Sequence, residues 1–156
     1  MAYRIRGLDP HLFEDHFRLD DASLARRGIV RRRVTAAGTS PCRVSLQDAL
    51  PDEEVLLLAF AHHVEERSPY RASGPIFVRR AAREPFDAVD VVPPILPARL
   101  ISLRAYDAAG MMVDAHVAPG VEIESHIYRF LARPEIARLD AHFAARGCFA
   151  CRIERS

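Results

Sequence analysis

The residue types best suited to bind a small polar molecule are gathered in residues 68–75, Ser-Pro-Tyr-Arg-Ala-Ser-Gly-Pro. This segment brings together the phenol of Tyr70, the guanidinium of Arg71 and the hydroxyl of Ser73, and the flexible Gly74 follows them. Apolar runs on both sides predict rigid strands, and polar groups on a loop between rigid strands commonly form a binding site. We interpret Tyr70, Arg71, Ser73 and Gly74 as ligand-binding residues; the alternative is a structural turn capped by Ser73.

A predicted β-hairpin around Asp107 and Gly110 supplies two further charged residues. Asp at the start and Gly at the end of the turn are typical of a three-residue loop with a bulge, which requires Gly110 at positive φ. This register places Arg104 directly opposite Asp114 on the polar face of the hairpin. The pair is either a solvated ion pair or an arginine held ready for an anionic ligand. On the second interpretation, Arg104 and Asp114 belong to the binding site.

The composition restricts which chemistry such a site can perform. All 22 basic residues are arginines, because the sequence contains no lysine. A lysine Schiff base, a pyridoxal phosphate anchor and a P-loop lysine are therefore excluded, and an anion has to be bound by arginine, histidine or backbone amides. Arginine favours planar partners such as carboxylate and phosphate. We expect Arg71 and Arg104 to converge on one cavity and to bind one small anion together.

Candidates for a catalytic group are Cys42, His62 and His142. A thiol close to an imidazole can act as a nucleophile, and Cys42 also precedes Arg43 in the sequence. No local signature supports such a pair, and a free cysteine more often packs as a small buried apolar side chain. The residues therefore do not decide whether the protein is an enzyme.

The spacings of cysteine and histidine do not predict a metal or redox centre. Cys148 and Cys151 have the spacing of a redox motif, but on a predicted strand an odd separation directs the two sulfurs to opposite faces. His62 and His63 are adjacent, so they cannot face one metal from a regular strand, and no third ligand has suitable spacing. We expect no metal site, no disulfide and no cofactor.

Hydrophobic patterning and turn residues predict an α+β fold with a mostly antiparallel sheet, two β-hairpins and about three helices packed on it. Helices are predicted after Asp9 and Asp20, two typical N-capping residues, and over residues 122–131, where apolar side chains recur at helical spacing. The predicted strands outside the hairpins cover residues 29–35, 42–46, 55–60 and 75–79. The length of 156 residues is suited to a single domain, residues 1–156.

The second hairpin lies at the end of the sequence, where Gly147 occupies the same position in the turn as Gly110. The same register predicts three apolar pairs: Phe143 with Phe149, Ala141 with Cys151, and Leu139 with Ile153. The opposite face then carries Asp140 across from Arg152, with His142 beside them. We expect this hairpin to bury Cys151 in the core.

Composition and charge also limit the partners. The formal net charge is +1, whereas a dedicated nucleic-acid binder needs a clustered surplus of positive charge. We interpret the run of arginines at residues 31–33 as a solvated strand edge, because Arg32 points away from its two neighbours. The longest apolar run, residues 55–61, is far shorter than a membrane-spanning helix. We expect no nucleic-acid partner and no membrane partner.

The cellular setting is also suggested by composition. The N-terminal residues lack the apolar segment and the cleavage site of a signal peptide. Three cysteines are an odd number with no disulfide framework, which is typical of a reducing compartment, so we expect a cytoplasmic protein. The sequence has neither lysine nor asparagine, whose codons are rich in adenine, and this indicates a bacterial genome rich in G and C.

Several segments together resemble a known sequence family. They are residues 41–46, 68–78, 102–107, 110–112 and 146–150. In combination they are similar, nearly end to end, to an uncharacterised bacterial family, domain of unknown function 1203. The resemblance implies a small single-domain bacterial protein without an assigned activity, so it transfers no catalytic residue. Cys148 agrees with the family pattern, whereas Cys151 departs from it.

Two functions remain open at this point. The first is a domain that binds a small anionic or polar ligand through Tyr70, Arg71, Ser73 and Arg104, with His142 nearby. The second is a non-catalytic homo-oligomeric or partner-binding module, in which the same polar residues attach loops to a sheet. A cavity shared by Arg71 and Arg104 favours the first function, and their separation favours the second.

Overall fold

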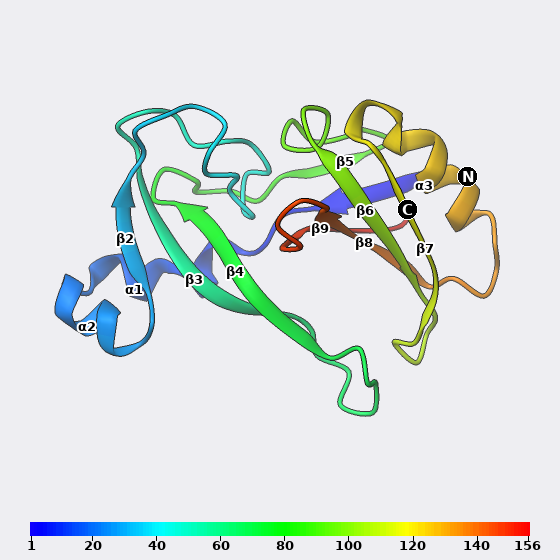
Figure 1. Cartoon of the computed structure of the whole chain (residues 1–156), viewed down its shortest axis with the longest axis horizontal. Coiled ribbons are helices and arrows are strands. Elements are labelled where there is room, and N and C mark those ends of the chain that lie inside the picture. Colours follow the sequence, from blue (N-terminus) through cyan, green and yellow to red (C-terminus); the bar gives the residue numbers. More distant parts are fainter.

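The computed structural model describes residues 1–156 and has an α+β fold with two antiparallel sheets (Figure 1). The large sheet has the order β5-β1-β9-β8-β6-β7. Its strands are β1 (Tyr3–Arg6), β5 (Asp87–Val89), β6 (Leu100–Tyr106), β7 (Met112–Pro119), β8 (Arg138–Phe143) and β9 (Phe149–Arg155). The small sheet has the order β2-β3-β4, formed by β2 (Val30–Arg33), β3 (Glu54–His63) and β4 (Ala72–Arg79).

The helices lie at the outer sides of the two sheets (Figure 1). A 3₁₀ turn (Pro10–Leu12), α1 (Glu14–Arg18) and α2 (Asp21–Arg26) accompany the small sheet, and α3 (Ile123–Leu131) covers the large one. As predicted, Asp9 and Asp20 cap these elements, since their carboxylates accept hydrogen bonds from the backbone amides of His11 and Ser23.

Each sheet has its own apolar core. The larger core contains 20 buried residues and joins the large sheet to Ile123, Ile127, Phe130 and Leu131 of α3. The smaller core contains 10 buried residues and packs Phe13 and Leu24 against the side of the small sheet that carries Leu56 and Leu58. The inner face of the large sheet, opposite its apolar core, carries Arg104, Asp140 and His142 and lies near the end of β3, where the rings of His62 and His142 are 5.0 Å apart. The face of the small sheet that carries Leu57 and Phe77 lines a groove. None of the helices is long and apolar enough to cross a membrane.

The β6–β7 hairpin confirms the predicted turn but not the predicted register. Gly110 has φ +76°, and the amide of Asp107 donates to the carbonyl of Met111 over 3.0 Å. A bulge next to Ala105 then shifts the pairing by one residue, so that Asp114 lies opposite Ala105 and Arg104 lies opposite Ala115. The predicted Arg104–Asp114 pair is therefore wrong. Alternation of residue types does not reveal a bulge, because one extra residue exchanges the two faces beyond it.

The β8–β9 hairpin shows a similar difference. Ala141 pairs with Cys151 and Leu139 with Ile153, as predicted, but a bulge places Phe149 opposite His142 instead of Phe143. Elsewhere, β3 extends to His63 and β4 begins at Ala72, so Ser73 and Gly74 belong to a strand and not to a loop. Residues 42–46 form no strand; Cys42 makes only an isolated bridge to Phe77.

Candidate functional site

The largest cavity is a groove of about 790 Å³ between the small sheet and the turn that joins β8 to β9. We call it the inter-sheet groove. Its lining residues are Arg32, Arg33, Val34, Thr35, Gly38, Thr39, Ser40, Pro41, Arg43, Leu57, Pro75, Phe77, Arg99, Leu100, Phe143, Ala145, Arg146 and Cys148. Its volume lies within the range of roughly 300–1,000 Å³ that is usual for small-molecule sites.

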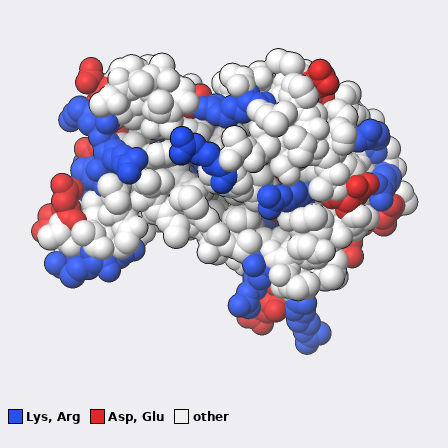
Figure 2. Space-filling model, viewed as in Figure 1, with Lys and Arg blue, Asp and Glu red and all other residues white.

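The lining of the inter-sheet groove carries positive charge only. It contains five arginines and neither aspartate nor glutamate. The sequence as a whole has 22 basic and 21 acidic residues, so this is a local separation of charge and not a consequence of a basic composition. Figure 2 shows arginine side chains over the hollow between the two halves, whereas most acidic side chains lie toward the periphery. The groove therefore has the electrostatic character of an anion site.

Four of these arginines have no carboxylate partner. Arg32 and Arg146 are exposed and make no ion pair, and Arg33 donates only to the backbone carbonyl of Asp52, over 2.7 Å. Arg99 differs, because both of its terminal nitrogens bind the carboxylate of Asp48, at 2.7 and 3.0 Å. Arg99 is thereby held in place at the groove with its charge largely balanced.

Arg43 is the fourth unpaired arginine and is buried, with 1% of its surface exposed. Its Nε donates to the carbonyl of Phe149 over 2.7 Å, and its Nη1 donates to the carbonyl of Pro41. Burial lowers the pKa of Arg43 from 12.5 to about 10, so the guanidinium remains charged at neutral pH. A buried charge that is bonded to carbonyls alone leaves a positive potential at the base of the groove.

Aromatic and apolar side chains complete the groove. The guanidinium carbons of Arg43 and Arg99 lie 5.0 and 5.1 Å from the ring centroid of Phe143, within the range of cation–π contacts. On the small sheet, Leu57 of β3 pairs with Phe77 of β4, and both line the groove while remaining partly exposed. The site thus combines unpaired guanidiniums with an apolar wall.

The residues predicted to bind a ligand from residues 68–75 lie elsewhere. Arg71 and Ser73 line a shallow cavity at the end of the β3–β4 hairpin, and Arg71 makes no ion pair. The ring of Tyr70 lies edge-on to that of Tyr106, with 6.2 Å between the centroids. The loop is attached to the neighbouring hairpin by Ser68, whose hydroxyl donates to the carbonyl of Gly110 over 2.7 Å. These contacts fit the alternative interpretation of residues 68–75, in which the segment is a structural turn.

Arg104 and Arg71 do not share a cavity. Arg104 lies on the inner face of β6 and lines none of the four cavities. Asp114 points away from it and binds Arg133 over 2.6 Å, and this pairing lowers the pKa of Asp114. The separation of Arg71 from Arg104 therefore does not favour the anion clamp predicted for them.

The catalytic candidates are packed in ways that suit structural roles. Cys42 is buried, and its sulfur accepts hydrogen bonds from the amides of Val44 and Arg79, at 3.4 and 3.3 Å. His142 is also buried; its Nδ1 donates to the carbonyl of Gly147 over 3.0 Å, and burial lowers its pKa from 6.5 to about 4. The ring of His62 lies 5.0 Å from that of His142, and burial lowers the pKa of His62 as well. No thiol–imidazole pair is formed.

A network of buried and partly buried charges lies where the large sheet meets the end of β3. Asp140 is fully buried and accepts two hydrogen bonds from Arg152, at 2.8 and 3.0 Å. Arg138 binds Glu65 over 2.5 Å, and Glu65 lies 3.2 Å from His63. Burial opposes ionisation of Glu65, but hydrogen bonds from its own backbone and from Arg138 outweigh it and lower its pKa. Because positive and negative charges are paired here, this network is suited to joining the sheets.

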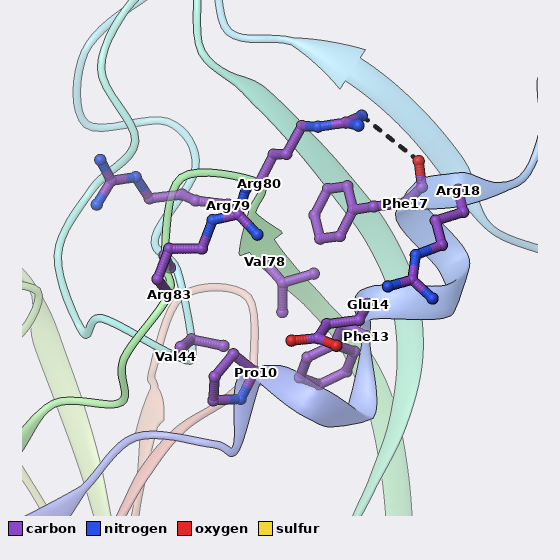
Figure 3. A pocket seen from close by; sticks show the side chains of 11 residues that line it. Pro10, Phe13, Glu14, Phe17, Arg18, Val44, Val78, Arg79, Arg80 and Arg83 are labelled. Carbon is purple, nitrogen blue, oxygen red and sulfur yellow. Dashed lines mark hydrogen bonds between the residues drawn. The ribbon is translucent and has the colours of Figure 1, made fainter.

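A second cavity, of about 170 Å³, lies between α1 and the end of β4 (Figure 3). Three of its four arginines are already engaged: Arg18 binds Asp15 over 3.1 Å, Arg79 binds Glu53 over 2.5 Å, and Arg80 binds Glu54 over 2.8 Å. Arg83 makes no ion pair. Figure 3 shows the carboxylate of Glu14 pointing toward the middle of the cavity, near Phe13 and Val78. This carboxylate and the small volume make the cavity less suited to an anion than the inter-sheet groove.

Sequence reasoning missed the arginines of the groove, which come from separate parts of the chain. The run at residues 31–33 was a signal, because it has no acidic neighbour, and we interpreted it as a solvated edge. Arg31 does lie at the edge and binds Glu54, whereas Arg32 and Arg33 line the groove. No local pattern marks Arg99 or Arg146, since only the packing of the two sheets brings them near the small sheet.

Comparison with known proteins gives a family but no activity. No curated protein and no solved structure matches the chain. The match to the family begins at residue 39, so it is less extensive than the nearly end-to-end resemblance and leaves Arg32 and Arg33 outside. Arg43, Arg99 and Arg146 lie within it. With residues 39–155 matched, the chain belongs to the family of proteins of unknown function DUF1203.

Proposed function

We propose that the protein binds a small anion in the inter-sheet groove. The observation that carries this proposal is the lining itself, in which four arginines lack a carboxylate partner and no acidic residue is present. The apolar walls lower the effective dielectric constant, so an anion in the groove would interact more strongly with the guanidinium groups, including that of the buried Arg43, than an anion at an open surface. Carboxylate or phosphate would suit the planar, forked guanidinium groups.

The proposal keeps the ligand class expected from the sequence and changes the location of the site. Arg32 and Arg33 approach from β2, Arg146 from the β8–β9 turn, and Arg43 from the base of the groove. We further propose a bacterial, cytoplasmic protein, which the free state of all three cysteines and the absence of lysine and asparagine support. No reaction is assigned to the groove: the thiol of Cys148 and the hydroxyls of Thr35, Thr39 and Ser40 line it, but no histidine, aspartate or glutamate lines it to act as a base.

The test is the thermal stability of the protein in increasing inorganic phosphate at constant ionic strength. A ligand that binds only the folded state raises the melting temperature, and the stabilisation grows with the logarithm of one plus the ratio of the ligand concentration to Kd. Phosphate should therefore stabilise the wild type, and Arg146→Gln should reduce the stabilisation several-fold. Arg27→Gln is the matched control, since Arg27 is exposed, makes no ion pair and does not line the groove.

Both variants remove one positive charge, so a general effect of net charge would reduce the stabilisation by phosphate equally in both. Equal responses of Arg27→Gln and Arg146→Gln, or no stabilisation of the wild type by phosphate, would contradict the proposal. Arg32→Gln provides a second variant on the opposite wall, where the same reduction is expected.

A further inference from the structure

The inter-sheet groove has a second property that an inorganic anion would not use. One wall is an apolar face of the small sheet, where Leu57 and Phe77 lie opposite each other on β3 and β4, and Pro75 follows on the same face. Strand geometry explains this wall, because residues two apart lie on the same side. The other side of these strands, with Leu56 and Leu58, is buried in the smaller core.

The facing wall is apolar as well. Leu100 of β6 and Phe143 of β8 line it, and Leu100 keeps 50% of its surface exposed. Exposed apolar side chains scattered over a surface need no explanation, but apolar side chains on two walls of one groove often mark a ligand site. The positive charges lie along the same groove, so a single ligand can contact both kinds of surface.

The arginines themselves show how a ring could bind. Arg43 and Arg99 already place their guanidinium groups against the ring of Phe143, at 5.0 and 5.1 Å from its centroid. A guanidinium can stack on an aromatic ring and at the same time donate hydrogen bonds to an anion. The hydroxyl groups of Thr35 and Thr39 line the groove and add further donors.

We infer that the ligand is an organic anion in which a phosphate or carboxylate is attached to a flat apolar ring. The anionic group binds the unpaired arginines, and the ring lies against Leu57 and Phe77. This inference rests on the proposed function and specifies its ligand. Inorganic phosphate would fill only a small part of the groove's 790 Å³ and would leave water on the apolar walls. Displacing that water adds a favourable contribution from the ring.

The test compares three probes by isothermal titration calorimetry: inorganic phosphate, phenyl phosphate and benzyl alcohol. Phenyl phosphate is expected to bind at least about tenfold more tightly than inorganic phosphate, a difference of about 1.4 kcal/mol. Benzyl alcohol, which has the ring without the charge, is expected to bind more weakly than either. Arg146→Gln should weaken the binding of both inorganic phosphate and phenyl phosphate.

Changes to the apolar walls separate the ring from the anion. Leu57→Thr introduces a β-branched residue that suits a strand and should reduce the preference for phenyl phosphate at least fivefold, with binding of inorganic phosphate unchanged. Leu100→Thr, at a half-exposed position on the other wall, should act in the same direction if Leu57→Thr does not fold. Val121→Thr is the control, because Val121 is 73% exposed and does not line the groove.

The outcomes distinguish the two proposals. If inorganic phosphate binds and phenyl phosphate binds no more tightly, the ring specificity is wrong and the anion site stands. If neither phosphate binds, both proposals are overturned. If benzyl alcohol binds as tightly as phenyl phosphate, the groove is an apolar site and the arginines are not its ligand-binding groups.

Discussion

The arginines of this chain fall into two groups, those that bind a carboxylate and those that have no carboxylate partner. Arg79, Arg99 and Arg152 each bind a carboxylate through two nitrogens, which fixes the position of the guanidinium. Arg43 and Arg146 have no carboxylate partner. Because an arginine side chain is not deprotonated at neutral pH, Arg43 keeps its charge although it is buried. An amine of ordinary pKa in the same place could lose its proton instead.

The burial of His142 predicts how the stability of the protein depends on pH. Burial lowers the pKa of His142 from 6.5 to about 4. Between these two pH values, His142 therefore stays neutral in the folded protein, whereas it takes up a proton in the unfolded chain. Since the unfolded state binds more protons between these values, stability falls as the pH falls from 6.5 to about 4. The contribution lost is about 3 kcal/mol on the scale of 1.36 kcal/mol per pKa unit.

Urea unfolding at pH 7 and pH 4.5 checks this expectation. In His142→Asn the amide nitrogen can replace Nδ1 as the donor to Gly147, and no titration remains. The stability advantage of the wild type over this variant should shrink by about 2–3 kcal/mol at the lower pH. His11→Asn removes an exposed histidine and should show no such change. An unchanged advantage in His142→Asn would disprove neutral burial of His142.

At the scale of elements, substitutions at Gly7 and Gly74 test how closely neighbouring segments of the chain pack against each glycine. Gly7 follows β1, and a Cβ added there would overlap the carbonyl oxygen of Val44, a backbone atom that cannot move away alone. Gly74 lies in β4 with no atom within 4 Å of an added Cβ. Gly7→Ala should therefore destabilise the protein by about 3 kcal/mol or more. Gly74→Ala should be neutral or stabilising by up to about 1 kcal/mol.

Chemical denaturation of the two variants measures the difference directly. The substitution is the same in both, so the general effect of adding a methyl group to a glycine cancels. Similar free energies of unfolding would contradict the close approach of Gly7 to Val44. Gly74→Ala also bears on the first site prediction, because a ligand bound against the backbone at Gly74 would lose affinity in this variant.

The sequence was informative about elements whose signals are local. Capping by Asp9 and Asp20, the apolar stripe of α3 and the turn ending in Gly110 each depend on residues within a few positions, and all were predicted. The bulges next to Ala105 and Ala141 were not, because a bulge is stabilised by packing across the sheet and not by the type of the extra residue. A one-residue shift was sufficient to separate Arg104 from Asp114.

The proposed site has the ligand chemistry that the sequence suggested, but it lies at a different position. The absence of lysine directed attention to arginine, and Arg71 was the most prominent one on a predicted loop. Unpaired arginines gather instead where β2 and the β8–β9 turn approach each other. Arg32 and Arg146 line the same groove although they are more than a hundred positions apart. This proximity depends on tertiary packing, for which a single sequence contains no periodic signal.

For the whole molecule, the two apolar cores raise the question of whether the two sheets unfold as one unit. Polar contacts join them: Arg152 of β9 binds Asp140 of β8 and also donates to the carbonyl of His62 in β3, over 2.7 Å. The rings of His63 and Tyr106 lie 4.6 Å apart across the same junction. The junction also holds the two walls of the groove together, so its integrity and the shape of the site are linked.

Asp140 is the residue on which this junction depends most. It is fully buried, and Asp140→Asn would leave the guanidinium of Arg152 without its carboxylate. Breaking a fully buried pair typically costs about 3–5 kcal/mol. Because the Arg152 side chain is 33% exposed and water can solvate it in part, we expect a smaller loss, about 2–3 kcal/mol.

Asp87→Asn is the matched control for this last prediction. Asp87 accepts two hydrogen bonds from Arg4, both of 2.6 Å, but the pair is exposed, so its loss should cost much less than the loss of the Asp140–Arg152 pair. Urea unfolding followed by circular dichroism gives both free energies, and hydrogen exchange gives the local stability of β3 and β9. We expect a single transition in the wild type, with β3 and β9 destabilised together by Asp140→Asn. Equal costs in the two variants would contradict the role given to Asp140. Exchange in β3 that is independent of exchange in β9 would show that the sheets unfold separately.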